Sequence, residues 1–242
     1  MKIVVLAGGL SPERNVSLST GTMVTEALRA LGHRAGLIDL YFGLETGGAD
    51  EAFFDAPVSE AYKKISREAP DLDQVRRGRK GDSPSMFGPG VLELCRMADM
   101  VFLALHGTCG EDGRVQAAFD LMGIPYTGAG YLGSAIAMDK DLTKRMVADV
   151  VSTPGWKTVT YTAADIDRLV ETARLPLVVK PVASGSSIGV SIAYTAGELR
   201  RSLTEGLALG GRTVLEEYIR GREIQVGILE DKALPSIEII PK

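Results

Sequence analysis

The feature that most constrains the fold is an apolar run at the start of the chain that ends in two glycines. Lys2–Ala7 is almost entirely apolar and is followed by Gly8-Gly9, which is typical of a buried strand that ends in a tight turn. Apolar and small residues then recur at three- and four-residue steps as far as Leu31, which predicts a helix. Ala35–Leu40 is a second buried-strand candidate. Strand, helix and strand in this order predict a parallel βαβ unit.

After this unit the regular pattern stops and later resumes. Glycines and prolines punctuate residues 43–90, which predicts an insertion with only short helical pieces. Beyond it, Val91–Met97 predicts a helix, Met100–Leu105 a buried strand and His106–Gly113 a loop, followed by a helix that carries Phe119. These elements continue the same parallel sheet. We therefore expect residues 1–128 to form an N-terminal α/β domain with an insertion.

The second half of the chain has a different pattern. Two short helices that contain Ala137-Met138-Asp139-Lys140 are predicted after the glycines at 128 and 130, and a further helix at Asp165–Ala173. Short strands are predicted at Val159–Tyr161, Leu177–Lys180, Val190–Ala193, Thr213–Glu217, Glu223–Leu229 and Leu234–Ile240. This mixture predicts an antiparallel α+β domain over 129–212. The strand candidates over 213–242 follow it.

Composition excludes several classes of protein. The chain has 242 residues with 31 acidic and 27 basic side chains, and this near balance gives no bulk signal for nucleic-acid binding. Cys95 and Cys109 cannot staple a fold of this size, and with only His33 and His106 they form no zinc cluster. No apolar run reaches the roughly 18 residues of a membrane-spanning helix or resembles a signal peptide. We expect a soluble cytoplasmic protein without nucleic-acid or membrane partners.

A loop of small residues follows the strand that ends in Lys180. The segment Lys180–Gly189 combines a lysine with glycines and serines, so its backbone N–H groups, hydroxyls and ammonium group could close on phosphate oxygens. A flexible hairpin tip with a solvated lysine has equal weight on spacing alone. The loop is not a Walker loop, because no Gly-Lys-Ser/Thr closes it, and the opening Gly8-Gly9 turn lacks the dinucleotide G-x-G-x-x-G spacing.

A second loop and a carboxylate are expected at one edge of the parallel sheet. His106–Gly113 and Glu13 both follow the carboxyl ends of buried strands, where open α/β sheets place their ligands. Alternatively, the loop is a glycine-rich turn with solvated acids, and Glu13 is a first-turn carboxylate favoured by the helix dipole. A nucleophilic pair of His106 and Cys109 is weakly supported, because no third orienting group is evident.

Taken in order, these motifs resemble the D-alanine:D-alanine ligase family of the ATP-grasp superfamily. The resemblance is carried by Gly8–Leu18, His106–Gln116, Met138-Asp139-Lys140, Lys180–Gly189 and Glu216–Ile219 with Gly221–Glu223. It implies an α/β fold of ATP-grasp ligase architecture. This comprises an N-terminal parallel α/β (preATP-grasp) domain, a central α+β domain and the beginning of a C-terminal ATP-grasp domain.

The resemblance also implies a reaction and a substrate site. The carboxylate of one D-alanine takes the γ-phosphoryl group of ATP, and the amine of a second D-alanine attacks the acyl phosphate to form D-alanyl-D-alanine for peptidoglycan precursors. Glu13 would bind the first ammonium group, Ser186 would hydrogen-bond to Glu13, and His106 would shape the pocket. Glu13 and Ser186 are thus the implied catalytic residues.

Further residues are implied for ATP. Lys140 and Lys180 would contact its phosphates, and Ser186 and Ser187 would close over the γ-phosphate. The adenine edge would meet Glu216, Glu217, Tyr218 and Ile219. Glu223 would accept hydrogen bonds from the ribose hydroxyls.

The chain departs from the family pattern at its C-terminal end. Family members continue past the equivalent of Pro241-Lys242 through acidic residues and an asparagine that bind two magnesium ions. The resemblance therefore implies that Mg²⁺ or Mn²⁺ accompanies ATP, with no metal ligand among these residues. It also implies that residues 1–242 are inactive alone.

Other functions stay open at this point. The insertion at 43–90 and the unidentified second substrate leave a D-alanine:D-lactate or D-alanine:D-serine ligase open. A nucleotide-binding module without ligase activity would also explain the missing metal site. A nicotinamide-dependent oxidoreductase rests on the opening βαβ pattern alone. The sequence does not fix the oligomeric state, for which a homodimer is one candidate.

Overall fold

The computed structural model describes residues 1–44, 48–63, 69–185 and 187–240. These residues form two compact units, which are considered separately below. Unit 1 comprises residues 1–150 together with 182–188, and unit 2 comprises residues 151–181 together with 189–242. None of the helices in the described ranges is long and apolar enough to cross a membrane.

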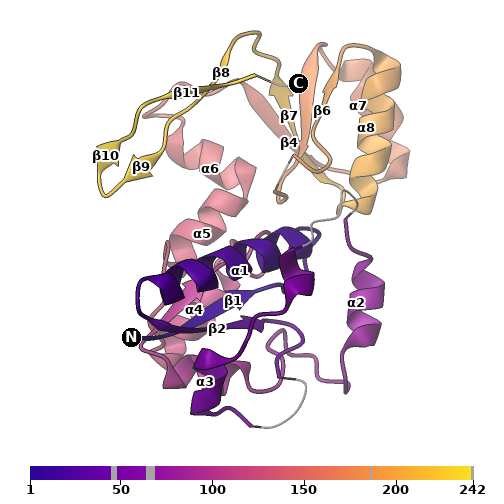
Figure 1. Cartoon of the computed structure of the whole chain (residues 1–242). Coiled ribbons are helices and arrows are strands. Elements are labelled where there is room, and N and C mark those ends of the chain that lie inside the picture. Colours follow the sequence, from indigo (N-terminus) through magenta and orange to yellow (C-terminus); the bar gives the residue numbers. More distant parts are fainter. Residues whose placement is uncertain (45–47, 64–68, 186, 241–242) are drawn as a thin grey trace. The chain divides into compact units, whose positions relative to one another are not determined.

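Unit 1 is built on the predicted parallel sheet. Strands β1 (Lys2–Ala7), β2 (Arg34–Asp39) and β3 (Met100–Leu103) lie in the order β2-β1-β3 and pair in parallel. Helix α1 (Arg14–Ala30) connects the first two strands, as Figure 1 shows. The βαβ prediction is confirmed, and β3 ends two residues earlier than expected.

The other elements of unit 1 are short. The insertion contains the 3₁₀ helices η1 (Glu51–Asp55) and η2 (Glu60–Lys63) and the helix α2 (Leu72–Gly78). Beyond it lie α3 (Val91–Met97), α4 (Arg114–Met122), α5 (Tyr131–Met138) and α6 (Lys140–Val147). The described part of the insertion thus has the short helical pieces expected of it. The two short helices before and after Asp139 are also confirmed.

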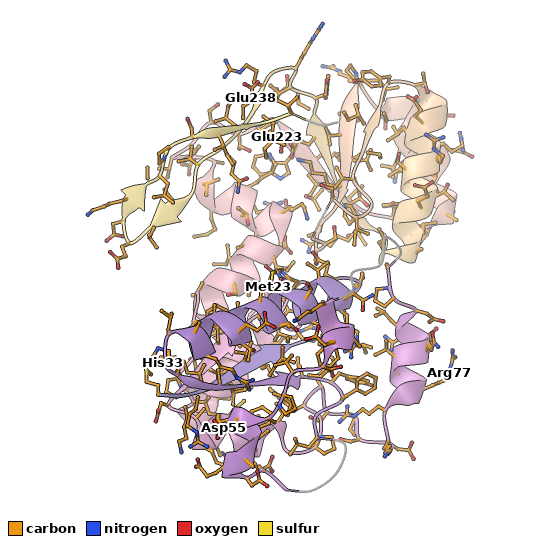
Figure 2. All side chains as sticks on the ribbon, viewed as in Figure 1. Met23, His33, Asp55, Arg77, Glu223 and Glu238 are labelled. Atoms are coloured by element: carbon orange, nitrogen blue, oxygen red, sulfur yellow. The ribbon has the colours of Figure 1, made fainter. Side chains whose placement is uncertain are left out.

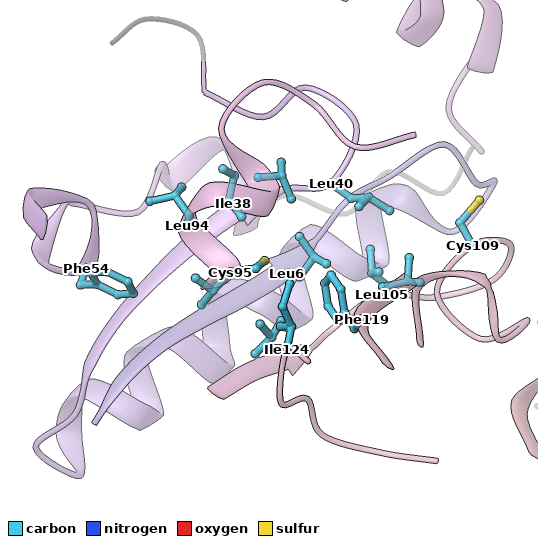
Figure 3. Packing of buried hydrophobic residues seen from close by; sticks show 14 residues of the cluster. Leu6, Ile38, Leu40, Phe54, Leu94, Cys95, Leu105, Cys109, Phe119 and Ile124 are labelled. Carbon is cyan, nitrogen blue, oxygen red and sulfur yellow. The ribbon is translucent and has the colours of Figure 1, made fainter. Parts of the chain in front are cut away.

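Both faces of the parallel sheet are buried, which explains the apolar run that opens the sequence. Alternate residues of β1 point to opposite faces: Val4 and Leu6 join one core cluster, and Val5 and Ala7 join another. Figure 3 shows the first cluster, in which Phe54 from the insertion is fully buried. The insertion is therefore anchored to the core of unit 1 through this side chain.

Unit 2 contains a four-stranded antiparallel sheet. Strands β4 (Trp156–Thr160), β5 (Leu177–Pro181), β6 (Ser191–Ala193) and β7 (Arg212–Glu217) lie in the order β4-β7-β5-β6. The short η3 (Ala163–Asp165) precedes α7 (Ile166–Thr172), and α7 and α8 (Ala196–Ala208) lie side by side against the sheet (Figure 1). The predicted antiparallel α+β arrangement is confirmed, although β4 begins three residues before the predicted strand.

Sequence analysis missed helix α8. It begins with a capping box in which the Thr195 hydroxyl accepts from the Glu198 N–H, and the Glu198 carboxylate accepts from the Thr195 N–H. Leu199 and Leu203, one turn apart, are fully buried in the core of unit 2. This helix therefore covers one face of the antiparallel sheet.

The capping box predicts a pH-dependent contribution to stability. The N–H groups of Tyr194 and Thr195 bond to the Glu198 carboxylate and lower its pKa. A lowered folded-state pKa stabilises the fold above the unfolded pKa, and that stabilisation is lost as pH falls through the folded value. Glu198→Gln should therefore lower the denaturation midpoint at pH 7 and have a vanishing effect near pH 3, with Glu205→Gln as the same-helix control. An equal effect at both pH values would contradict this.

The last part of unit 2 differs from the two long strands predicted there. It forms two separate antiparallel pairs, β8 (Glu223–Gln225) with β11 (Ile237–Ile239) and β9 (Ile228–Leu229) with β10 (Lys232–Ala233). The inner pair closes on Glu230-Asp231, which both have positive φ, as in a type I′ turn. All residues of these strands are exposed. Figure 2 labels Glu223 and Glu238 on this ribbon.

Candidate functional site

Glu13 lies at the start of α1, at the edge where β1 and β3 end. Its backbone N–H donates to the Ser11 hydroxyl at 3.0 Å, and that hydroxyl donates to the carbonyl oxygen of His106 at 2.8 Å. The His106 Nε2 atom lies 3.3 Å from the Thr20 hydroxyl. The structure therefore brings the two predicted substrate residues, Glu13 and His106, to one edge of the sheet.

The Glu13 carboxylate occupies a slot between two glycines. A Cβ atom built on Gly107 would lie 2.7 Å from the Glu13 Oε2 atom, and one built on Gly185 would lie 2.8 Å from it. Gly107 also has a φ of +73°, which disfavours any other residue. Only glycine at these two positions leaves room for the carboxylate where it stands.

Two buried side chains that sequence analysis did not single out support this turn. Arg14 directly follows Glu13 and forms an ion pair with Asp39, the last residue of β2. Their side chains are 7% and 3% exposed. Asp39 ends a parallel strand at the ligand-binding edge, and this position was the signal that could have identified it.

The small-residue loop packs against the start of α6. The Lys140 N–H donates to the Val182 carbonyl oxygen at 3.0 Å, and its ammonium group donates to the Ser184 carbonyl oxygen at 2.7 Å. A backbone bridge also pairs Asp139 with Ala183. Two of the predicted phosphate elements, Lys140 and the loop, are thus in direct contact.

Two predicted serines lie in this loop. Ser187 is exposed and adopts a left-handed φ of 57°. Ser186, predicted to hydrogen-bond to Glu13 and to close over phosphate, lies outside the described residues. Among the described residues of the loop, Gly185, which directly precedes Ser186, lies beside the Glu13 carboxylate.

In unit 2, Lys180 forms an ion pair with Glu216. The Lys180 ammonium donates to the Glu216 carboxylate at 2.9 Å, and the two side chains are 27% and 8% exposed. Their strands, β5 and β7, are neighbours in the sheet, with Val178 opposite Glu216 and Lys180 opposite Val214. Lys180 and Glu216 therefore share one face of the sheet.

The predicted adenine contacts do not lie on one face. Because side chains alternate along a strand, Glu217 points to the face opposite Glu216. Glu217 and Tyr218 line a cavity of about 740 Å³ that also touches Leu169 of α7 and Leu215, on the helix-covered side of the sheet. A single ligand could meet residues 216–219 through their backbone, but not through the side chains of both glutamates.

Tyr218, Ile219 and Glu223 follow β7. The Tyr218 ring packs edge-on against Tyr194 with centroids 5.7 Å apart, and the Ile219 side chain is exposed. Glu223, at the start of β8, is exposed. The assignment of Glu223 to the ribose hydroxyls stays a prediction.

Cys109 is unsuited to nucleophilic chemistry. Its side chain is buried in the core cluster of Figure 3, and burial raises the pKa of its thiol. A thiol of raised pKa carries little thiolate at neutral pH. The structure therefore disfavours the His106–Cys109 pair.

The described residues contain no cluster of side chains that could bind a metal ion. No three His, Cys, Asp or Glu side chains gather there in a way that could hold an ion. The two acidic side chains of the His106–Gly113 loop form hydrogen bonds within it: Glu111 accepts from the Gly107 N–H at 2.7 Å, and Asp112 accepts from the Cys109 N–H at 2.9 Å. These acids hold the loop rather than forming a metal site.

Comparison with known families and proteins gives consistent matches. Residues 2–129 match the model of the D-ala D-ala ligase N-terminus, and residues 149–242 match that of the C-terminus. The D-alanine–D-alanine ligase of Pediococcus pentosaceus is 41% identical over 99% of this chain and 69% of its own length. That of Aquifex aeolicus is 37% identical over 100% of this chain and 67% of its own length. The chain thus spans about two thirds of these relatives.

Solved structures agree with the sequence relatives. The ATP complex of D-alanine–D-alanine ligase from Bacillus anthracis matches with a TM-score of 0.67 and 29% identity, over 100% of this chain and 67% of that one. The ligase from Coxiella burnetii matches with a TM-score of 0.67 and 29% identity, over 98% of this chain and 70% of that one. The predicted α/β ATP-grasp fold class is confirmed. The N-terminal and C-terminal family models together match most of the chain, and the relatives match it over nearly its whole length. The chain therefore belongs to the D-alanine–D-alanine ligase family.

Proposed function

We propose that this chain carries the first D-alanine site and the nucleotide-binding elements of an ATP-dependent D-alanine–D-alanine ligase. The observation that carries the proposal is the Glu13 carboxylate, held between Gly107 and Gly185 at the substrate edge of a chain of this family. A carboxylate fixed in this way suits an ammonium group, because an ion pair with hydrogen bonds is strong at a partly buried site. The family relationship supplies the amino acid, D-alanine.

The proposed reaction has two steps. The carboxylate oxygen of the first D-alanine forms a bond to the γ-phosphorus of ATP, and the bond to the β-phosphate oxygen breaks, releasing ADP. The amine of the second D-alanine then attacks the acyl phosphate carbon and loses a proton, and inorganic phosphate leaves. Glu13 orients the first D-alanine through its ammonium group, His106 shapes the pocket wall, and Ser186 bonds to Glu13.

The nucleotide roles follow the same proposal. Lys140 and Lys180 contact the ATP phosphates, and Ser186 and Ser187 close over the γ-phosphate. The segment Glu216–Ile219 meets the adenine edge, chiefly through its backbone since Glu216 and Glu217 face opposite ways. Glu223 accepts from the ribose hydroxyls.

Several broader features belong to the proposal. Mg²⁺ or Mn²⁺ accompanies ATP, but the described residues do not fit a metal site, so no step is assigned through it. Residues 1–128, 129–212 and 213–242 serve as substrate-binding, central and C-terminal parts. The protein works in the cytoplasm as a homodimer, in the synthesis of peptidoglycan precursors.

The test is ADP formation by the full-length protein. We expect ADP release that depends on D-alanine, together with D-alanyl-D-alanine detected by mass spectrometry. Parallel reactions with D-lactate or D-serine as second substrate identify its preference. ATP binding without D-alanine-stimulated ADP release would instead support a nucleotide-binding module and contradict the proposal.

A further inference from the structure

The buried ion pair of Arg14 and Asp39 has no part in the reaction proposed above. Both side chains lie almost wholly out of water, at 7% and 3% exposure. Removing two charges from water is costly, and such pairs are often no more stabilising than apolar residues of the same size. A buried pair directly beside the proposed substrate carboxylate therefore calls for a role other than stability.

The pair links the ends of two strands to the first turn of α1. Besides its bond to Asp39, the Arg14 guanidinium donates from Nη1 to the carbonyl oxygen of Gly9 at 2.7 Å. The Asp39 Oδ1 atom accepts from the N–H groups of Tyr41 at 2.8 Å and Phe42 at 3.1 Å. The guanidinium also lies over the Phe42 ring, 4.7 Å from its centroid. The Arg14 guanidinium thus holds the turn after β1 by hydrogen bonds to two different residues.

Glu13 depends on the position of that turn. It precedes Arg14 in the chain, and its carboxylate lies so close to Gly107 and Gly185 that a Cβ atom on either glycine would come within 2.7 or 2.8 Å of it. A shift of several tenths of an ångström in the turn would move the carboxylate against one glycine or away from the ammonium site. Misplacement of a binding group by about 1 Å can cost about a hundredfold in rate.

We infer that Arg14 and Asp39 are positioning residues that fix the Glu13 carboxylate for the first D-alanine. The inference rests on the proposed function and goes beyond it, because the proposed function assigns no role to either residue. The planar Arg14 guanidinium holds the turn through two hydrogen bonds, one from Nη1 to the Gly9 carbonyl oxygen and one from Nη2 to the Asp39 carboxylate. A lysine keeps the charge but cannot make both bonds in this geometry.

The test compares Arg14→Lys and Asp39→Asn with the parent in the full-length protein. Each folded variant should raise the KM for the first D-alanine about tenfold or more. The dissociation constant for ATP should stay within about twofold, because ATP binding does not use the turn. Arg34→Lys is the matched control: Arg34 also forms ion pairs, with Glu51 and Asp55, but at the opposite end of β2.

A double-mutant cycle separates positioning from a merely structural role. If Arg14 acts through Glu13, Arg14→Lys should have almost no further effect on this KM in a Glu13→Gln background, whereas independent effects would add. Additive effects, an unchanged KM in the single variants, or loss of folding in both variants would overturn the inference. An unchanged KM in Glu13→Gln alone would instead overturn the proposed function.

Discussion

Replacing Glu13 by glutamine should raise the KM for the first D-alanine by about 10- to 100-fold. The substitution keeps the shape of the side chain in its glycine slot but removes the charge, and a hydrogen bond to a charged group contributes about 1.5–3 kcal/mol. ATP affinity should stay nearly unchanged, because the substitution removes only the ion pair between Glu13 and the ammonium group of the first D-alanine. Steady-state kinetics at saturating ATP, with calorimetric titration of ATP, measure both effects.

The matched control for this substitution lies on the same helix. Glu26 is exposed on α1 and forms an ion pair with Lys63 at 2.9 Å, away from the slot. Glu26→Gln should leave the KM for D-alanine and the affinity for ATP as they are. A first-site KM that is the same in Glu13→Gln and in the parent would remove Glu13 from the substrate site.

Replacing Lys180 by methionine should weaken ATP binding about tenfold or more. A charge-assisted contact with a phosphate is lost, which is worth about 1.5–3 kcal/mol. The variant should also melt at a lower temperature, since the Glu216 carboxylate, at 8% side-chain exposure, loses its ion pair with Lys180. Calorimetric titration and thermal denaturation follow the two effects separately.

A second substitution distinguishes phosphate binding from simple destabilisation. Adding Glu216→Gln to Lys180→Met removes the buried negative charge that the Lys180 ammonium no longer neutralises, so the melting temperature should rise again. ATP binding should stay about tenfold weaker than in Glu216→Gln alone, because the missing ammonium group is the only difference between these two variants. Equal ATP affinity in the two would show that Lys180 serves only to neutralise Glu216.

The placement of the substrate side chains could be predicted from the sequence because it depends on topology. Parallel strands joined by right-handed crossovers bring their carboxyl ends to one edge. Glu13 and His106 each follow such a strand, so their proximity required only the strand assignments. Arg14 and Asp39 are 25 residues apart, and the position of Asp39 at the end of a predicted strand was the one sequence signal for their ion pair.

Two other differences had signals in the sequence. Thr195 and Glu198 have the spacing of a capping box, and Leu199 and Leu203 follow at helical spacing, so α8 was predictable despite the glycines near its end. The opposite orientations of Glu216 and Glu217 follow from strand alternation alone. The left-handed pair Glu230-Asp231 lies between the strands predicted at 223–229 and 234–240, and the structure has four short strands in place of these two.

Unit 1 is not a continuous stretch of sequence, since residues 182–188 belong to it while their flanks belong to unit 2. During synthesis on the ribosome, β1, α1 and the His106 loop emerge long before Gly185 does. The Glu13 carboxylate can therefore gain the second wall of its slot only after residues 151–181, the first segment of unit 2, have been translated. Cutting the polypeptide after residue 150 would likewise separate these parts. Glu13 and Lys140 would lie on the first fragment, and the loop residues Ser184 and Gly185 that lie against them would lie on the second. The proposed substrate site is thus a product of the later part of the chain as much as of the earlier one.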